Sequence, residues 1–144
     1  MLKKGMGKMR SKRQAQDRLR GRSCDKVQEP KGSFRQLAGI AQLTSLNVGG
    51  SGVGDKDLSP VARLSHLEVL ALQNTRITGA ALVQLKGMQR LNVLNLKNCR
   101  VSDGDLEVLL SMPNLRIVHA AGSDISEAAV RTMNEKLPML SIFR

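Results

Sequence analysis

Aromatic residues are nearly absent from this chain, which has two Phe, no Tyr and no Trp in 144 residues. The scarcity excludes a surface that stacks unpaired nucleobases on aromatic rings, and it excludes an aromatic cage. Two Cys are too few for a disulfide framework. The two His, His66 and His119, stand too far apart for the common zinc-binding spacings. The composition supports no metal or cofactor site, and no nucleophile or general base is placed as an enzyme would need.

Long apolar runs are also missing. The uncharged stretch 36–54 contains five Gly together with Gln, Thr, Ser and Asn, and it is too polar for a helix that spans a bilayer. The N-terminus lacks the apolar core of a secretory signal peptide. We therefore expect an intracellular protein without membrane contact, with nucleus, cytoplasm and mitochondrion left open.

Positive charge is concentrated in the first quarter of the chain. Residues 1–36 contain twelve Lys and Arg against three acidic residues, a net charge of +9 out of +11 for the whole chain. Because this segment has few aliphatic residues, residues 1–32 are predicted to be a basic arm that is disordered unless bound. Its candidate contacts to RNA phosphates or to an acidic surface are Lys3, Lys4, Lys8, Arg10, Lys12, Arg13, Arg18, Arg20 and Arg22.

Two other interpretations of the basic arm stay open. An Arg-rich, acid-poor N-terminus is typical of mitochondrial presequences, and the run KMRSKR could serve nuclear import. Alternatively, the arm is a solvated tail without a partner. Cys24 lies in this segment with no partner motif and receives no role.

The remaining residues repeat with a period of 24. Successive units align in three apolar columns: Leu43, Leu67, Leu91 and Leu115; Leu46, Leu70, Leu94 and Val118; and Val48, Leu72, Leu96 and Ala120. The second half of each unit aligns as well, in the columns Leu58, Leu82, Leu106 and Val130 and Val61, Leu85, Leu109 and Met133. One extra residue in the fourth unit moves its last apolar position to Leu137 and the next start to Leu140. Stacked units of this kind share one continuous core.

Each unit changes its apolar period in the middle. LxxLxL ends in period 2, which predicts a short strand, and the later residues three apart predict one face of a helical turn. The pattern LxxLxLxx(S/T/C)x(V/I), continued by VGDKDLSPVARL, ITGAALVQLKGM and VSDGDLEVLLSM, resembles the leucine-rich-repeat family. It is similar to the subclass LxxLxLxxTxVTDxGLxxL, which is related to the cysteine-containing repeats. The resemblance implies an α/β solenoid of four repeats over residues 33–144.

The two ends of the solenoid have their own signals. Residues 33–42 match the helical half of a repeat that lacks its strand, so we expect an N-terminal half-repeat cap that begins at Ser33. The alternative is that residues of a partner chain complete this repeat. Residues 126–137 are predicted to be the last helix, because Pro138 follows them. Leu140, Ile142 and Phe143 are expected to supply a short closing strand.

The ninth repeat position holds Ser51, Thr75, Cys99 and Ser123, where the commonest residue of the family is Asn. The resemblance implies that these side chains point inward and bond backbone groups of the turn, which makes Cys99 a buried ladder residue rather than a nucleophile. The glycine-rich run GGSGVGDK at 49–56 lacks the spacing of a phosphate-binding loop and is expected to be a turn. The Asp residues at 55, 57, 103 and 105 are expected to begin helical segments, where they complement the helix dipole.

Strand residues between the ladder positions are expected to point outward on the concave side of the solenoid. Their column Val69, Val93 and Ile117 is apolar, which favours a protein partner, although β-propensity alone could explain it. The candidate protein-binding residues are Asn47, Val69, Ala71, Gln73, Val93, Asn95, Lys97, Ile117 and His119. Arg76, Lys97 and Arg100 at the strand exits either extend the footprint of the arm or are solvated charges.

These observations predict a non-catalytic scaffold that is a component or assembly factor of a ribonucleoprotein particle. The basic arm would bind RNA phosphates, and the solenoid would dock on protein. The alternative is a protein-only adaptor whose arm binds an acidic surface such as a filament or microtubule, and the family resemblance also allows a ubiquitin-ligase adaptor. A third hypothesis is an organellar assembly factor that retains its targeting sequence. No cofactor, small-molecule substrate or membrane partner is expected.

Overall fold

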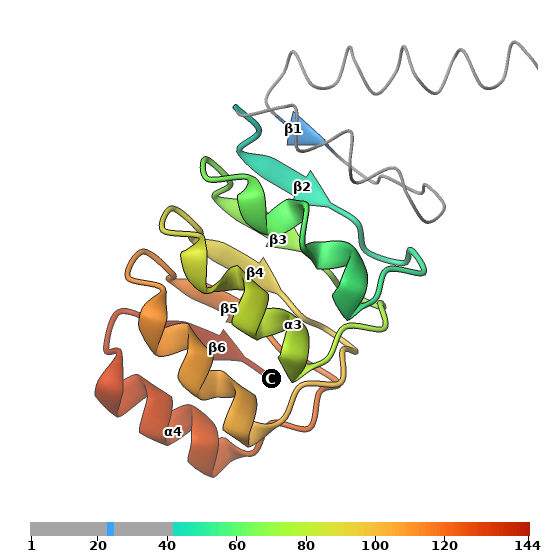
Figure 1. Cartoon of the computed structure of the whole chain (residues 1–144). Helices are drawn as coiled ribbons and strands as arrows, with labels where there is room; N and C mark the ends of the chain where they lie inside the picture. The colour runs from blue at the N-terminus through green and yellow to red at the C-terminus, as the bar shows by residue number, and fades with distance from the viewer. Residues whose placement is uncertain (1–22, 25–41) are drawn as a thin grey trace, which may run out of the picture.

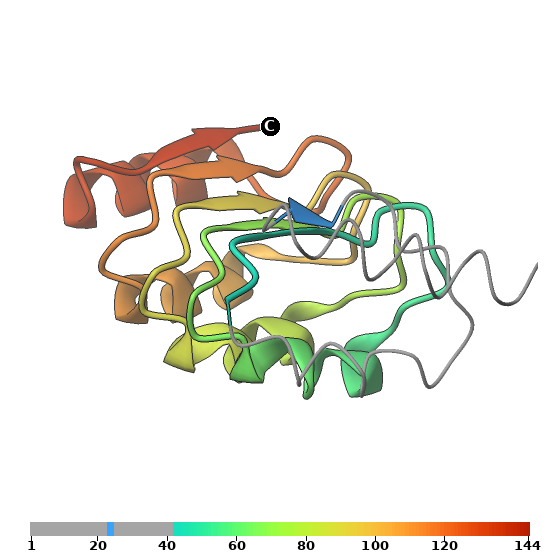
Figure 2. The same ribbon diagram turned by 90° about the horizontal axis from the view of Figure 1, so that it is seen from above.

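The computed structural model describes residues 23–24 and 42–144. A parallel six-stranded sheet, in the order of the sequence, forms one side of this part of the chain, and short helical segments form the other (Figures 1 and 2). The strands are β1 (Ser23–Cys24), β2 (Ser45–Asn47), β3 (Val69–Ala71), β4 (Val93–Asn95), β5 (Ile117–His119) and β6 (Ser141–Phe143). The helical segments are η1 (Asp55–Leu58), η2 (Val61–Arg63), α3 (Gly79–Gln84), η3 (Leu85–Gly87), η4 (Asp103–Ser111) and α4 (Glu127–Lys136).

The strand register confirms the repeat of 24 residues. Leu46 of β2 pairs with Leu70, which pairs with Leu94, which pairs with Val118. From β2 to β6 every paired position is separated from the next by this same step, and each strand is followed by a helical return as far as β5. Because neighbouring strands are parallel, the helical segments lie side by side and cover one face of the sheet (Figure 1). The predicted α/β solenoid is therefore what the chain forms.

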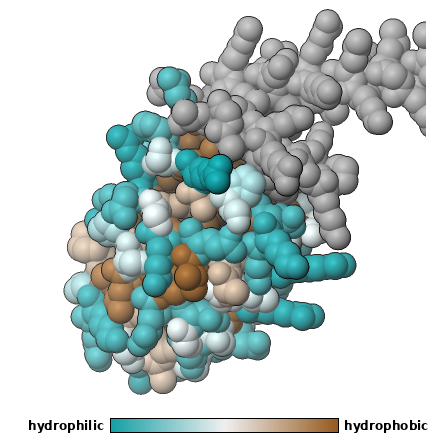
Figure 3. Space-filling model, in the orientation of Figure 1, coloured by the Kyte–Doolittle hydropathy of each residue, from teal (hydrophilic) through white to brown (hydrophobic). Residues whose placement is uncertain are grey.

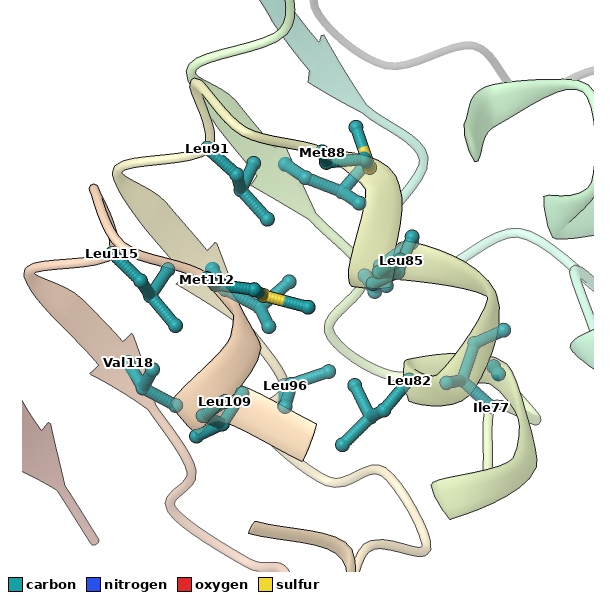
Figure 4. Close-up of a cluster of buried hydrophobic side chains, with 14 of the residues drawn as sticks. Ile77, Leu82, Leu85, Met88, Leu91, Leu96, Leu109, Met112, Leu115 and Val118 are labelled. Atoms are coloured by element: carbon teal, nitrogen blue, oxygen red, sulfur yellow. The ribbon is translucent and has the colours of Figure 1, made fainter. Parts of the chain in front are cut away.

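The ladder side chains form one continuous core between the strands and the helical segments. Leu82 of α3, Leu109 of η4 and Leu96 after β4 point into the same interior in Figure 4, and all three are fully buried. The core is almost entirely Leu, Ile, Val, Met and Ala, and Thr75 is the single buried polar residue among those described. Burial of each large aliphatic side chain contributes about 1.5–3 kcal/mol to stability. A single repeat cannot bury its own ladder, whereas stacked repeats bury enough to offset the conformational entropy that the chain loses on folding.

The ninth repeat position behaves as predicted. The hydroxyls of Ser51, Thr75 and Ser123 donate to the carbonyl three residues earlier, at 2.5, 2.6 and 2.5 Å respectively. The thiol of Cys99 is buried and donates instead to the carbonyl oxygen of Leu72, at 3.1 Å. These bonds tie each inward side chain to a carbonyl of the turn; those of Val48 and Ala120 also accept from the backbone N–H of Ser51 and Ser123. Cys99 is therefore a structural residue.

A column of left-handed turn residues was not anticipated from the sequence. Gly50, Asn74, Asn98 and Gly122 stand 24 residues apart and have φ angles of +74°, +56°, +55° and +75°. Gly adopts this conformation at no steric cost and Asn at low cost, so the turn disfavours β-branched and bulky residues. The amide of Asn98 also donates to Asn74 Oδ1 at 2.7 Å, which links two neighbouring turns.

Gly122→Ala is expected to lower the free energy of unfolding by about 1–3 kcal/mol. Its φ of +75° strains any side chain, and an added Cβ would lie 2.0 Å from Asn98 Oδ1. Gly104→Ala is the matched control, because no atom lies within 4 Å of its added Cβ and its φ is ordinary. Urea denaturation of both variants measures the difference, and equal stability of the two would contradict the turn assignment.

Acidic residues begin the helical segments, as predicted. Two of them, Asp55 and Asp103, also accept hydrogen bonds from the next repeat, and we call each such pair of bonds a clamp. The Asp55 carboxylate accepts from the backbone N–H of Thr78 at 2.7 Å and from its hydroxyl at 2.5 Å. Asp103 accepts in the same way from Ser126, at 2.6 and 2.7 Å. Thr78 and Ser126 are themselves the N-caps of α3 and α4. Each clamp therefore fixes where the helix of the following repeat starts.

The clamp at Asp103 predicts a pH effect on stability. Hydrogen bonds from the backbone and the side chain of Ser126 lower the pKa of Asp103 below its ordinary value. A lowered folded-state pKa gives stability that is present above the unfolded-state pKa and is lost as pH falls through the folded value. Asp103→Asn is therefore expected to be less stable than the wild type at pH 7, with the difference shrinking below about pH 4.

Thermal melts between about pH 2 and pH 7 test this effect. The control is Asp124→Asn, because Asp124 is exposed two residues before Ser126 and no hydrogen bond or ion pair of its carboxylate with a described residue is present. The clamp is refuted if the stability of Asp103→Asn follows that of the wild type at every pH.

The first strand differs from the sequence-based expectation. Residues 33–42 were predicted to be a half-repeat without its strand, yet β1 pairs in parallel with β2 through Ser23↔Ser45 and Cys24↔Leu46. The expectation of a missing strand is therefore wrong, and the strand lies inside the range assigned to the basic arm. Its spacing to β2 is not 24, which is why the periodicity did not reveal it. Pairing satisfies backbone groups on the otherwise open edge of β2. Residues 1–22 and 25–41, and with them the half-repeat cap, lie outside the described residues.

The C-terminal end agrees with the prediction. α4 is capped by the hydroxyl of Ser126, which accepts from Ala129 N–H at 3.2 Å, and it ends at Lys136 with Leu137 as its C-cap, just before Pro138. Leu140 is buried and β6 closes the sheet. Phe143, in contrast, points away from the core and stays 53% exposed.

Candidate protein-binding face

The side chains of β2 to β6 that point away from the core, with Gln73 and Lys97 just after β3 and β4, form a surface that we call the strand face. Its first column places Val69, Val93 and Ile117 on adjacent strands, because Val69 pairs with Val93 and Val93 with Ile117. Neighbouring strands lie about 4.8 Å apart, so these side chains touch or nearly touch. Val69 is 36% exposed, and Val93 and Ile117 are half-buried. The predicted apolar column therefore exists and reaches solvent.

The second column brings His119 against Phe143. The strand pairing places these residues side by side, and their rings stack with centroids 5.4 Å apart and an interplanar angle of 24°. Asn47, Ala71 and Asn95 complete the column on β2, β3 and β4. Phe143 was predicted only as part of the closing strand, and its place on the strand face was not predicted. Its position 24 residues after His119 pointed to this column, but the step of 25 from Leu115 to Leu140 pointed to another register.

The third column consists of Gly49, Gln73, Lys97 and Ala121, and the contacts of Gln73 hold its first two members together. The amide of Gln73 lies over Gly49, where an added Cβ would be 2.3 Å from Gln73 Nε2. The same nitrogen is 3.4 Å from Asn47 Oδ1. Lys97, the next residue of the column, is exposed, and only the small Ala121 follows it on the neighbouring repeat. The strand face therefore presents a fixed amide at one end and a free ammonium nearer the other.

The cations at the strand exits stand close together. Arg76 N–H donates to the carbonyl of Val53, and Arg100 N–H donates to that of Ile77, which places these two exposed residues on adjacent rungs. Among residues 42–144 the ion pairs are those of Glu127 with Arg131 and Arg144. Arg76, Lys97 and Arg100 therefore form no ion pair within the described part of the chain, and Asp124 follows Arg100 on the next rung. Like charges at this spacing repel, which favours an anionic partner.

The structure brings together all nine predicted protein-binding residues, since each lies on the strand face. The predicted arm contacts, from Lys3 to Arg22, lie outside the described residues. The glycine-rich run at 49–56 forms a turn and the start of η1. His66 contacts Arg90, with Nδ1 3.1 Å from a guanidinium nitrogen, and neither His belongs to a ligand cluster of the described residues.

Residues 23–24 and 42–144 contain no group of His, Cys, Asp and Glu that could hold a metal ion. No helix within these ranges has the length and apolar character needed to cross a membrane.

The side of the molecule opposite the strand face carries the helical segments. It is mostly hydrophilic, with apolar side chains confined to small patches (Figure 3). Val83 of α3, 52% exposed, and Leu110 of η4, 40% exposed, are the large apolar residues exposed within the described helical segments. These residues provide matched controls for the strand face.

Solved structures with the same architecture are leucine-rich-repeat proteins. Internalin C2 from Listeria monocytogenes is 28% identical, with a TM-score of 0.59 over 76% of this chain and 44% of that one. A second Listeria monocytogenes internalin is 21% identical, with a TM-score of 0.55 over 84% of this chain and 39% of that one. A leucine-rich-repeat protein of Leptospira interrogans is 17% identical, with a TM-score of 0.54 over 83% and 35% of the two chains.

The repeat pattern and these structures together show that the chain has the leucine-rich-repeat fold. No protein-family model and no curated protein matches the sequence. The chain spans less than half the length of each of these three solved structures. Leucine-rich-repeat proteins are generally protein-interaction scaffolds and are typically non-catalytic.

Proposed function

We propose that the chain is a non-catalytic scaffold that docks on a protein through its strand face and binds RNA through its basic arm, as a component or assembly factor of a ribonucleoprotein particle. The observation that carries the protein half is the column of Val69, Val93 and Ile117, which leaves apolar side chains partly in water on a rigid sheet. The RNA half is supported by charge alone, the net +9 of residues 1–36.

The first test is quantitative affinity purification of the full chain from nuclease-treated extract. The double variant Val93→Thr/Ile117→Thr keeps the β-branched shape at both positions but makes the column polar. We expect it to lose the co-purifying proteins that the wild type retains. Val83→Thr, which makes the same change on exposed α3, is expected to retain them. Loss from both variants, or from neither, would refute the strand face as the protein-binding site.

Nuclease treatment also separates the two candidate functions. Proteins retained only without nuclease favour a ribonucleoprotein particle, since RNA then links them to the arm. Proteins that withstand nuclease and still depend on the arm favour the second candidate, a protein-only adaptor whose arm binds an acidic surface. The cations Arg76, Lys97 and Arg100 are compatible with an acidic protein and are the observation that supports this candidate.

A further inference from the structure

The strand face is not uniform along the solenoid. At β2 its outward residues are Ser45 and Asn47, which are small and polar. At β5 and β6 they include Ile117, His119 and Phe143, with the two rings stacked on each other. Apolar and aromatic area therefore gathers over the C-terminal half of the strand face, where a partner would find its anchor.

Cations flank this apolar half on two sides. Lys97 and Arg100 lie beyond the C-terminal ends of the strands and are exposed. Arg116 lies just before β5, where its guanidinium donates to the carbonyls of Pro113 and Leu115, at 3.0 and 3.1 Å. None of the three forms an ion pair with a residue of the described ranges. Asp124 is the single acidic residue in the turn after β5, so positive charge predominates beside the anchor.

From this placement we infer that the strand face takes an acidic protein segment that carries a bulky apolar side chain. The inference rests on the proposed docking function and names the chemistry of the partner. The apolar side chain would lie on Val93, Ile117 and the exposed ring of Phe143, and a carboxylate would meet Lys97. Apolar burial supplies affinity, and the cations select the acidic sequence and orient it.

The geometry also sets a spacing within the segment. Lys97 follows Val93 by four residues, two beyond the end of β4, which corresponds to at most about 13 Å. A segment that runs along the strands therefore places its carboxylate about four residues from its apolar anchor. RNA fits less well, because a phosphate backbone would have to lose water against Val93 and Ile117 without gaining a hydrogen bond there.

A subtractive selection from displayed random peptides of about 16 residues tests the inference on the full chain. The library is first depleted on Lys97→Glu/Ile117→Thr, which retains the basic arm, so acidic peptides that bind only the arm are removed. The remaining peptides are selected on the wild type. We expect enrichment in Asp and Glu about four residues from Leu, Ile or Phe. Thermal melts establish that each variant is folded.

The selected peptides are then titrated by fluorescence anisotropy. Lys97→Glu and Ile117→Thr, each alone, are expected to weaken binding at least about tenfold, or about 1.4 kcal/mol. Lys86→Glu and Val83→Thr on the helical side are expected to change it less than about twofold. Any of three results would overturn the inference. The enriched peptides could lack acidic residues, acidic peptides could bind Lys97→Glu as tightly as the wild type, or no peptide could be enriched over the depleted library.

The outcome is separable from that of the proposed function. Affinity purification that depends on Val93 and Ile117 would keep the docking function even where the selection fails. A single-stranded RNA of about 20 nucleotides that binds with the same dependence on Lys97 and Ile117 as the peptides would overturn the inference in favour of a nucleic acid on the strand face.

Discussion

Leu94→Ala is expected to lower the free energy of unfolding by about 2–5 kcal/mol, a large part of the stability of a domain of this size. Leu94 lies in the centre of β4 with no exposed surface, and it pairs with Leu70 on one side and Val118 on the other. Removing its side chain leaves a cavity that touches three repeats. Because each repeat is held only by its neighbours, the loss interrupts the stack at its middle.

The matched control for this prediction is Leu110→Ala. The same atoms are removed from η4, where Leu110 is 40% exposed, so the expected loss is below about 1 kcal/mol. Guanidinium or urea denaturation of both variants measures the two values. Equal losses would mean that the continuous ladder is not the main source of stability.

The second large effect concerns the basic arm and salt. If the nine predicted arm residues each neutralise one phosphate, the affinity for RNA falls by about 10³–10⁵ between about 50 and 200 mM salt. Replacing all nine with Gln is expected to abolish this dependence together with most of the binding. Fluorescence titration of an RNA of about 20 nucleotides against the full chain measures both.

The control for the salt effect is Lys86→Gln/Arg90→Gln, which removes two exposed cations from the solenoid. It should leave the salt slope nearly unchanged. A flat salt response of the wild type, or a steep response that survives neutralisation of the arm, would contradict RNA binding by the arm.

Much of the fold follows from the periodic pattern of the sequence, but the register of the last strand does not. The extra residue in the fourth unit separates Leu140 from Leu115 by 25 positions, an alignment that would put Phe143 in the ladder column of Val118. The structure keeps the step of 24 instead, so Ile142 pairs with Val118 and Phe143 stays exposed. The extra residue is absorbed between α4 and β6, and the matching of columns cannot show where.

Some features of the strand face could be predicted from the sequence, and others could not. Outward positions such as Val93 and Ile117 follow from period 2 along a strand and period 24 between strands, so the apolar column was predictable. The stack of His119 on Phe143 depends on the register of β6, which the sequence left undetermined. The hydrogen bonds of Ser126 to Asp103 could not be predicted from the sequence either, because they join residues of different repeats and depend on side-chain geometry.

The most direct test of the central claim, that the strand face is the protein-binding surface, is site-specific photo-crosslinking in cells. A photoreactive amino acid replaces Ile117 on the strand face or, as the control, Val83 on the helical side. We predict protein adducts from position 117 that withstand nuclease, and none of the same mass from position 83. Adducts from position 83 alone, or identical adducts from both positions, would contradict the account.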